Sequence, residues 1–376
     1  MNLELAYVQC KRCVMDTTDP DITFDSEGNC NHCSSFISHI SQEKKIISLQ
    51  KKNLDAVLSN IKTSGDKQTF DCIVGISGGV DSCFTAYLCK ELGLKPLLLH
   101  LDNGWDSEIA VLNIHQLAQQ LNIPYTSYVL DWEEFKQLQL AFLRSSIVDL
   151  EIPTDLAIPG ALYKIAAKHN IKYIISGGNY TSEGILPIKW GYHVKKDLKL
   201  YRSIIKKHGT IRRKKTPATG YLSELYYKFF KGIKTIYLLN YIDYNKDEAK
   251  KLLMEKFDWK DYGGKHHESR FTAFWQGYLL PEKFGIDYRK ATLSTQICFG
   301  QKSRDEALNE LTQSPFDSEK IAADKKYLCK KLQISEEELA HIIAQKPKYY
   351  TDFPNEEKRI DFIYSIYRKL YPNKRI

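Results

Sequence analysis

Short apolar runs alternate with longer amphipathic stretches between residues 70 and 176. Four of these runs are typical of buried strands, and they span Phe70–Ile76, Lys95–Leu101, Tyr125–Leu130 and Lys172–Ser176. Between the runs, apolar residues recur at helical spacing over Val80–Leu92, from a start at Asp106 or Ser107, over Trp132–Arg144 and over Leu162–His169. Strands and helices that alternate with short connections predict an α/β fold with a doubly wound parallel sheet. Ligands of such a sheet lie beyond the carboxyl ends of its strands.

The rest of the chain has a different character. We expect a metal-binding module over residues 1–50, an α/β domain over 51–300 and a helical region over 301–376. A basic insertion, 185–235, interrupts the central domain. Between Lys195 and Lys215 it carries ten Lys or Arg residues and one acid, Asp197. Such a run is typical of a solvated face, and a docking surface for an anion or a partner is the alternative.

The net charge favours an anionic partner, and the hydropathy of the chain argues against a membrane protein. The 376 residues include 54 Lys and Arg and 46 Asp and Glu, and the formal net charge of +8 favours an anionic partner without identifying it. No stretch approaches the roughly 18 consecutive apolar residues of a membrane span. The start, Met1–Glu4, lacks the basic and apolar regions of a signal peptide. We therefore expect a cytoplasmic protein of enzyme size.

Four of the nine cysteines form two Cys-x2-Cys pairs separated by sixteen residues, Cys10, Cys13, Cys30 and Cys33. This arrangement is typical of a tetrahedral zinc site with four thiolates, and such a closed site is structural. Coincidental pairs of free thiols are the alternative, since disulfides are not expected in a chain without an export signal. The other five cysteines are isolated in the sequence and are expected to be small buried apolar residues: Cys72, Cys83, Cys89, Cys298 and Cys329.

The most informative residues are Ser77-Gly78-Gly79-Val80-Asp81-Ser82, between the first predicted strand and its helix. Two glycines let backbone N–H groups close around a phosphate, and the helix N-terminus adds partial positive charge. Ser77 and Ser82 can donate hydroxyl hydrogen bonds, whereas Asp81 is expected to orient the loop or to hold magnesium. A Walker A loop is excluded because no Gly-Lys-Ser/Thr follows. The motif resembles the PP-loop of the ATP pyrophosphatase superfamily, whose members cleave ATP to AMP and pyrophosphate.

Two further segments agree with this resemblance. Asp102 and Asn103 end the second strand, at a position that lines the adenosine site in the superfamily. Gly177-Gly178-Asn179 ends the fourth strand and is similar to the second nucleotide loop of NAD synthetase and its relatives. By that resemblance, Glu183 is a candidate magnesium ligand. A plain glycine turn is the alternative for each segment taken singly.

The cluster Gly263-Gly264-Lys265-His266-His267-Glu268-Ser269 brings a cation, two imidazoles and a carboxylate into one turn. Adjacent histidines project in different directions and lack the i, i+4 spacing of a helical metal pair. We expect a phosphate-facing loop in which Lys265 helps to neutralise the leaving pyrophosphate and His266 or His267 polarises the substrate, with the Glu268 carboxylate beside them. A structural turn is the alternative.

The order of these motifs, from the two cysteine pairs to the segment Leu293–Gln301, resembles the N-acetyl sugar amidotransferase family (the WbpG and PseA type) over nearly the full length. The resemblance implies an enzyme that adenylylates a sugar acetamido group and replaces its oxygen with ammonia, for O-antigen lipopolysaccharide or flagellar glycan biosynthesis. It also implies a PP-loop domain of the adenine nucleotide alpha hydrolase-like fold. The implied cofactors are ATP, Mg²⁺ and Zn²⁺, and the substrate is a nucleotide-linked or nonulosonic acetamido sugar.

Ammonia is expected to come from another subunit. Glutamine hydrolysis normally needs a cysteine directly after Met1 or in a Gly-x-Cys-x-Gly elbow, and position 2 is Asn2 while none of the nine cysteines has the second setting. We therefore expect a separate glutaminase subunit that resembles that of imidazole-glycerol-phosphate synthase, together with its barrel partner. Membranes and nucleic acids are not expected partners.

Two other classes of protein are weighed against this interpretation. A tRNA-thiolating enzyme also joins a PP-loop to zinc-binding cysteines, but its chemistry needs reactive cysteines near the adenylate. Here Cys72 lies within a predicted strand and Cys83 on a predicted helix. A zinc-ribbon protein that binds nucleic acid through a decayed nucleotide fold is disfavoured, because the Ser77–Ser82 loop is intact.

Overall fold

Five parallel strands form the central sheet, in the order β3-β2-β1-β4-β5. A computed structural model describes residues 7–40, 53–180, 184–191, 195–210, 215–262, 268–316 and 318–370. The strands are β1 Cys72–Gly75, β2 Pro96–Asp102, β3 Tyr125–Val129, β4 Tyr173–Ser176 and β5 Lys234–Tyr237. The chain adds β2 and β3 on one side of β1 and then crosses to its other side for β4 and β5. The predicted doubly wound parallel sheet is confirmed, and the reversal between β1 and β4 is where such sheets bind ligands.

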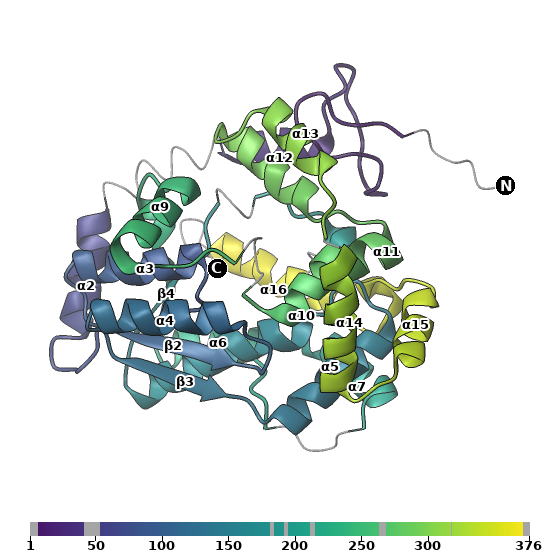
Figure 1. The fold of residues 1–376 in the computed structure, drawn as a ribbon. Coiled ribbons are helices and arrows are strands. Elements are labelled where there is room, and N and C mark those ends of the chain that lie inside the picture. Colours follow the sequence, from purple (N-terminus) through teal and green to yellow (C-terminus); the bar gives the residue numbers. More distant parts are fainter. Residues whose placement is uncertain are drawn as a thin grey trace.

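Helices cover both faces of the sheet (Figure 1). Cys72 and Val74 of β1 pack on one face in a core with α2 Leu54–Ser64, α3 Val80–Glu91, α4 Glu108–Gln120 and α9 Lys246–Phe257. Ile73 points to the opposite face, where it packs against α6 Ile152–Lys168. Burial on both faces explains why the central strands are apolar at successive positions instead of alternating with polar residues.

Most of the helix starts agree with the sequence pattern. Ser107 caps α4 by accepting a hydrogen bond from Ala110 N, so Asp106 is not the cap. The expectation of a helix over Leu162–His169 is wrong at its start, because α6 already begins at Ile152. Two prolines obscure that start in the sequence. Pro153 occupies the first turn, where its missing N–H has no partner to lose, and the helix continues through Pro159.

The remaining helices and short connecting elements of the described chain are α5 Trp132–Ser145, η1 Ile188–Trp190, α7 Leu198–His208, α8 Tyr221–Phe229, η2 Leu238–Tyr241, α10 Arg270–Phe274, the π-helix η3 Trp275–Leu279, α11 Leu280–Phe284, α12 Arg289–Phe299, α13 Arg304–Thr312, α14 Ser318–Leu332, α15 Glu336–Ala344, η4 Tyr350–Asp352 and α16 Glu357–Leu370. Several of them, α5, α7, α10, α11, α12, α14 and α15, pack around a separate, larger core. The predicted helical C-terminal region is confirmed. Among the described residues, no helix combines the length and apolar character needed to cross a membrane.

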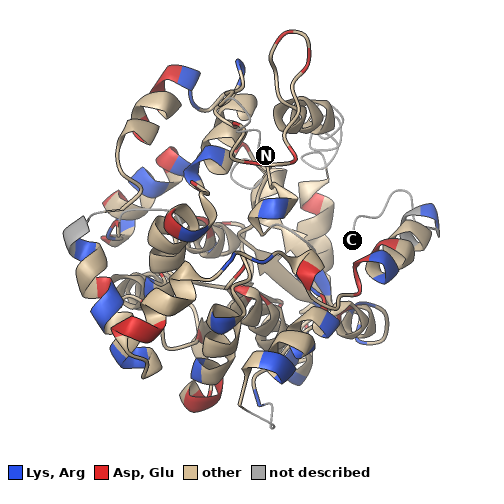
Figure 2. Ribbon diagram, turned by 90° about the vertical axis from the view of Figure 1, so that its right-hand side faces the viewer, with Lys and Arg blue, Asp and Glu red and all other residues tan. Residues whose placement is uncertain are grey.

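The described part of the basic segment is largely neutralised by neighbouring acids. Lys195 pairs with Asp149 and Asp155, Lys196 with Glu224, and Lys215 with Asp131. Helix α7 buries its apolar face against α5, while Lys and Arg positions are interspersed with Asp and Glu positions around the molecule (Figure 2). These contacts favour a structural, partly solvated segment over a free anion-binding face.

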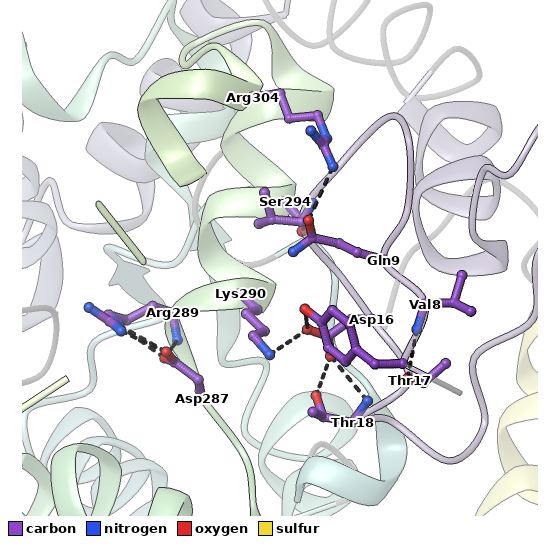
Figure 3. Close-up of polar contacts among 12 residues, drawn as sticks. Val8, Gln9, Asp16, Thr17, Thr18, Asp287, Arg289, Lys290, Ser294 and Arg304 are labelled. Carbon is purple, nitrogen blue, oxygen red and sulfur yellow. Dashed lines mark hydrogen bonds and ion pairs between the residues drawn. The ribbon is translucent and has the colours of Figure 1, made fainter. Parts of the chain in front are cut away.

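The N-terminal segment that carries the two cysteine pairs lies beside α12 and α13 (Figure 1). Arg304 on α13 donates hydrogen bonds to the backbone carbonyls of Cys10 and Cys13 at 3.0 and 3.1 Å. Lys290 on α12 forms an ion pair with the fully buried Asp16 at 2.5 Å (Figure 3). The segment is therefore held to the C-terminal helices by hydrogen bonds and by a partly buried ion pair.

We expect Lys290→Met to lower the free energy of unfolding by about 3 kcal/mol, because it leaves the buried Asp16 carboxylate without its cation. Denaturant titration measures the change. Lys251→Met is the matched control, since the Lys251–Glu255 pair is exposed and such pairs contribute less than about 1 kcal/mol. Equal effects of the two substitutions would contradict a stabilising role of the Asp16 pair.

Candidate functional site

The glycine loop, residues 77–82, connects β1 to α3 at the reversal point of the sheet. Gly78 has a φ of +85°, and a Cβ atom there would lie 2.4 Å from the carbonyl oxygen of Ala110 on α4. The Gly78 carbonyl accepts a hydrogen bond of 2.9 Å from the indole of Trp259. Only glycine fits this position, because any other residue would add both left-handed strain and a steric clash.

The two serines of the loop hold its shape from inside. The Oγ atoms of Ser77 and Ser82 lie 3.2 Å apart, and Ser82 Oγ also accepts a hydrogen bond from Ser77 N at 3.2 Å. Gly79 is the N-cap residue of α3, and no side chain caps the helix there. The N–H groups of Val80 and the next residues are thus not used by a capping side chain, which is the arrangement that binds phosphate at a helix N-terminus.

Asp81, in the first turn of α3, is held by a tyrosine from another part of the chain. The hydroxyl of Tyr244 donates a hydrogen bond to Asp81 Oδ1. Burial, reinforced by the Asp81 carboxylate, raises the pKa of Tyr244 far above its ordinary value, so the phenol remains a donor. This tether orients the carboxylate, and sequence reasoning missed it because 163 residues separate the two side chains.

The loop after β4 packs directly against the glycine loop. A Cβ atom on Gly177 would lie 3.0 Å from both Asp81 C and Ser82 N. A Cβ atom on Gly178 would lie 3.1 Å from the ring of Tyr237, and Asn179 Nδ2 donates to the Gly177 carbonyl at 3.2 Å. The structure therefore brings together the two glycine segments that the sequence analysis singled out.

Asp102 and Asn103, at the end of β2, take different positions. Asp102 Oδ1 accepts a hydrogen bond from Gly104 N at 2.9 Å, so this carboxylate shapes the turn. Asn103 is buried and lines a cavity that also reaches the glycine loop. Of the two residues, Asn103 is therefore the one placed to contact a ligand there.

Two cavities meet at the glycine loop. The first cavity, of about 640 Å³, extends along the ends of β1, β2 and β4 toward α6. The second, of about 480 Å³, lies between the loop and the helices α9 and α12. The residues that line both are Ser77, Ser82, Gly177, Glu268, Gln276 and Tyr288. A ligand held by the loop could therefore extend in two directions.

Glu268 lies close to the glycine loop, although residues 263–267 of the predicted histidine cluster are not described. A Cβ atom on Gly79 would lie 3.6 Å from Glu268 Oε1. The Glu268 carbonyl accepts a hydrogen bond from Ser107 N at 2.7 Å, which fixes this segment beside α4. Asp81 and Glu268 both line the second cavity, and carboxylate oxygens of this kind fit the hard-ligand preference of Mg²⁺.

Four predicted site residues lie outside the described part of the chain. They are Glu183, Lys265, His266 and His267.

A buried histidine that the sequence analysis overlooked lines the first cavity. His100 Nδ1 lies 3.0 Å from the Ile76 carbonyl, and Nε2 lies 3.1 Å from Asp106 Oδ2. Burial alone would lower the pKa of His100, but the Asp106 carboxylate outweighs it and the pKa is raised. Two acceptors and a raised pKa fit a doubly protonated ring. The signal available in the sequence was a lone histidine inside the leucine run of β2.

The Sγ atoms of the four paired cysteines converge and all lie within 4.8 Å of one another. A zinc–sulfur distance of about 2.3 Å places the sulfur atoms of a tetrahedral site about 3.8 Å apart. The Sγ atoms of Cys10 and Cys33 lie 3.7 Å apart, and those of Cys13 and Cys30 lie 3.5 Å apart. All four residues are buried, so the cluster fits an enclosed metal ion.

The expectation of a small buried residue is wrong for Cys298, which is partly exposed, and right for the other four cysteines outside the cluster. Cys298 lies on α12 near the cysteine segment, and the neighbouring Cys33 thiol raises its pKa. The Cys89 thiol and burial raise the pKa of Cys72 well above the ordinary value.

Gly78→Ala is expected to weaken nucleotide binding by more than tenfold, because the added methyl group meets the Ala110 carbonyl and the backbone strain costs roughly 1–3 kcal/mol. Binding of ATP by isothermal titration measures the loss. Gly232→Ala is the matched control, since Gly232 also has a positive φ of +67° but an added Cβ meets nothing within 4 Å. A similar affinity for both variants would rule out the proposed close packing of the loop.

Cys13→Ser is expected to abolish stoichiometric metal binding and to lower stability, since a structural metal site couples binding to folding. Metal content by elemental analysis and the thermal midpoint test this outcome. Cys329→Ser removes a buried thiol outside the four-cysteine cluster and should leave the metal content unchanged. A Cys13→Ser protein with full metal content would refute the tetrahedral assignment.

Two family models match separate parts of the chain. Residues 49–185 match the NAD synthase model, and this range contains the glycine loop and the loop after β4. Residues 268–371 match the C-terminal domain of the LPS biosynthesis protein WbpG-like family, a range that begins at Glu268.

A curated relative matches over a short stretch. The tRNA(Ile)-lysidine synthase of Chlamydia pneumoniae is 36% identical over 64 residues, which cover 16% of this chain and 20% of that protein. The match therefore spans far less than two thirds of the relative.

The solved structures that match this chain have low sequence identity and low TM-scores. NMN synthetase from Francisella tularensis has a TM-score of 0.38 and 16% identity, with 71% of this chain and 91% of that chain covered. NH3-dependent NAD synthetase from Campylobacter jejuni has a TM-score of 0.31 and 17% identity, with 81% and 98% covered. U34-tRNA thiolase NcsA from Methanococcus maripaludis has a TM-score of 0.31 and 16% identity, with 79% and 88% covered.

The two family models fall on the two parts of the chain that meet at the glycine loop, one on the α/β domain and one on the C-terminal helices. The chain is therefore similar to the NAD synthase family over residues 49–185 and to the C-terminal domain of the WbpG-like family over residues 268–371.

Proposed function

We propose that the chain is an ATP-dependent amidotransferase that converts the acetamido group of a sugar to an acetamidino group. The observation that carries this proposal is the placement of the glycine loop, with its uncapped helix N-terminus, where two cavities meet. One cavity can hold adenosine or the acceptor beside the strand ends, while the loop holds the phosphates between them.

The reaction proceeds in two steps. The amide oxygen of the acceptor attacks the α-phosphorus of ATP, pyrophosphate leaves, and the amide nitrogen loses its proton to give an O-adenylyl imidate. Ammonia then adds to the imidate carbon, and AMP leaves with the former amide oxygen. An amide oxygen is a poor leaving group. Once the oxygen carries the adenylyl group, it can leave as part of AMP.

The side chains around the loop suit the first step. Backbone N–H groups at the start of α3 stabilise charge on the transferred phosphate. Asp81 and Glu268 are the described carboxylates that would hold Mg²⁺, which neutralises phosphate charge when bound. The four-cysteine cluster would hold Zn²⁺ in a structural role, away from the reacting atoms.

Ammonia is supplied by a partner in this proposal. A separate glutaminase subunit, resembling that of imidazole-glycerol-phosphate synthase and acting with its barrel partner, would hydrolyse glutamine. The biosynthetic context we propose is surface polysaccharide, such as O-antigen, or flagellar glycan.

Modification of tRNA is the second candidate, because the 64-residue match is to a tRNA(Ile)-lysidine synthase. Thiolation would need a reactive cysteine beside the loop. Cys83 is the cysteine nearest the loop in the sequence, but burial raises its pKa to about 12. Such a thiol is protonated at neutral pH, which favours the amidotransferase over a thiolase.

The purified chain, given MgATP, an ammonium salt and N-acetylglucosamine, its UDP conjugate or N-acetylneuraminic acid, should release pyrophosphate and AMP with at least one acceptor. Mass spectrometry should show exchange of the acetamido oxygen for NH. Glutamine alone should not replace ammonium. Formation of ADP, or release that depends on tRNA instead of an acetamido compound, would refute the proposal.

Asp81→Asn should reduce pyrophosphate release by at least 100-fold while leaving the metal content and thermal midpoint unchanged, because it alters only the carboxylate beside the glycine loop. Asp55→Asn, on the exposed face of α2, is the matched control and should retain wild-type turnover. Equal rates for the two variants would remove Asp81 from the catalytic machinery.

A further inference from the structure

The first cavity has two chemically different ends. Near the sheet, its wall is formed by aliphatic side chains such as Leu99, Ile158, Leu162 and Ile175. Away from the sheet, it is lined by ionisable and hydrogen-bonding groups, which we call the polar pocket: Glu151, Asp155, Trp190, Lys195 and Thr272. An apolar wall suits a flat heteroaromatic base, whereas the polar pocket suits a ligand with many hydrogen-bonding groups.

Glu151 is a buried carboxyl group that nothing described so far uses. Its Oε1 accepts a hydrogen bond of 2.8 Å from the hydroxyl of Thr272. Burial, followed by the nearby Asp155 carboxylate, raises the pKa of Glu151 to about 7. A carboxyl group poised near neutrality can either accept or donate a hydrogen bond with a ligand hydroxyl.

Lys195 is fixed in the polar pocket by two acids. Its Nζ lies 2.5 Å from Asp155 Oδ2 and 3.3 Å from Asp149 Oδ2. These carboxylates raise the pKa of Lys195 despite the opposing effect of burial, so the ammonium remains charged. Because both acids already pair with this cation, the polar pocket carries no free positive charge for an anionic ligand.

Trp190 supplies an unsatisfied donor. Its side chain lines the cavity and is 1% exposed, and its indole N–H has no hydrogen-bond partner among the described residues. A buried donor without a partner costs roughly 1–3 kcal/mol, which an oxygen atom of a bound ligand would recover. The Trp190 indole therefore indicates a ligand in the polar pocket independently of the carboxylates there.

The polar pocket is continuous with the glycine loop through the C-terminal helices. Thr272 lies in the polar pocket on α10, and Gln276, one turn later, lines both cavities together with Ser77. A ligand in the polar pocket therefore shares a wall with whatever the glycine loop holds.

We propose that the polar pocket binds the uncharged, hydroxyl-bearing ring of the acetamido acceptor, with Trp190 donating to an acceptor oxygen and Glu151 pairing with a hydroxyl. This inference rests on the proposed function and adds the place and orientation of its acceptor.

The charge of the polar pocket determines how an acidic acceptor is oriented in it. Among the residues that the structure describes, the cations that line the first cavity are already paired: Lys195 with Asp149 and Asp155, Lys196 with Glu224, and His100 with Asp106. Together, Glu151, Asp149, Asp155 and Lys195 carry a net charge of about −2, or about −1 when Glu151 is protonated. A carboxylate or diphosphate on the acceptor would be repelled, so that group points out of the polar pocket.

Trp190→Phe and Glu151→Gln test the inference. Glu151→Gln keeps the shape of the side chain and removes the ionisable group, whereas Trp190→Phe removes the indole N–H together with part of the ring. With the acceptor that wild type uses best, Trp190→Phe should raise the acceptor KM about three- to tenfold, the loss of one hydrogen bond. Glu151→Gln should also raise it, and the KM for ATP should stay within twofold for both variants. A purely structural role would change both KM values and kcat together.

Trp105→Phe is the matched control. Trp105 is also 1% exposed with an indole N–H that lacks a partner among the described residues, but it lines neither cavity. Its substitution should leave the acceptor KM unchanged. If Trp190→Phe and Glu151→Gln behave like Trp105→Phe, the polar pocket is not the acceptor site although the proposed function stands. A lower KM for an acidic acceptor in Glu151→Gln would overturn the orientation.

A binding measurement without turnover distinguishes a failure of the polar-pocket assignment from a failure of the proposed function. Wild type with α,β-methylene ATP should bind the acceptor in a titration, and Trp190→Phe should weaken that binding by the same factor as KM. If wild type neither binds nor turns over N-acetylglucosamine, its UDP conjugate or N-acetylneuraminic acid, the proposed function fails and this inference fails with it.

Discussion

The close approach of Gly78 to the Ala110 carbonyl is the constraint on which the site depends. A gap that admits no Cβ atom brings the first turn of α3 against α4, and the indole of Trp259 fixes the same glycine from the other side. Once this contact is made, the backbone N–H groups at the start of α3 face the point where the strand order reverses. Every group assigned to nucleotide chemistry is positioned relative to that turn.

The elements that could be predicted are those with a local signal. Apolar runs of strand length marked β1 to β4, and the Ser77–Ser82 motif marked the phosphate site, because both depend on neighbouring residues. Strand β5 carries no comparable run, since Lys234–Tyr237 lies at the sheet edge with exposed side chains. The start of α6 was missed because Pro153 and Pro159, which lie within this helix, normally indicate the end of a helix in a sequence.

The contacts that escaped prediction join residues far apart in the chain. Tyr244 on Asp81, Cys298 beside Cys33, and Thr272 on Glu151 are side-chain interactions between different elements, and no periodicity reveals them. His100 had a visible signal, because it is a polar residue in an apolar strand. Its partner Asp106 was only one of two candidate helix caps in the sequence. His100 and Asp106 both line the first cavity because of tertiary packing, which the spacing of residues in the sequence does not reveal.

The run Arg270–Phe284 contains a π-helical turn, Trp275–Leu279, between two α-helical turns. A π turn bonds each residue five positions back and so accommodates one residue more than an α turn. Removing that residue would leave an ordinary α turn, so the side chains of the wide turn would move relative to those of α10. Chain length here is therefore as constrained as residue identity: Thr272 and Gln276 reach their places together only while the register of this wide turn is kept.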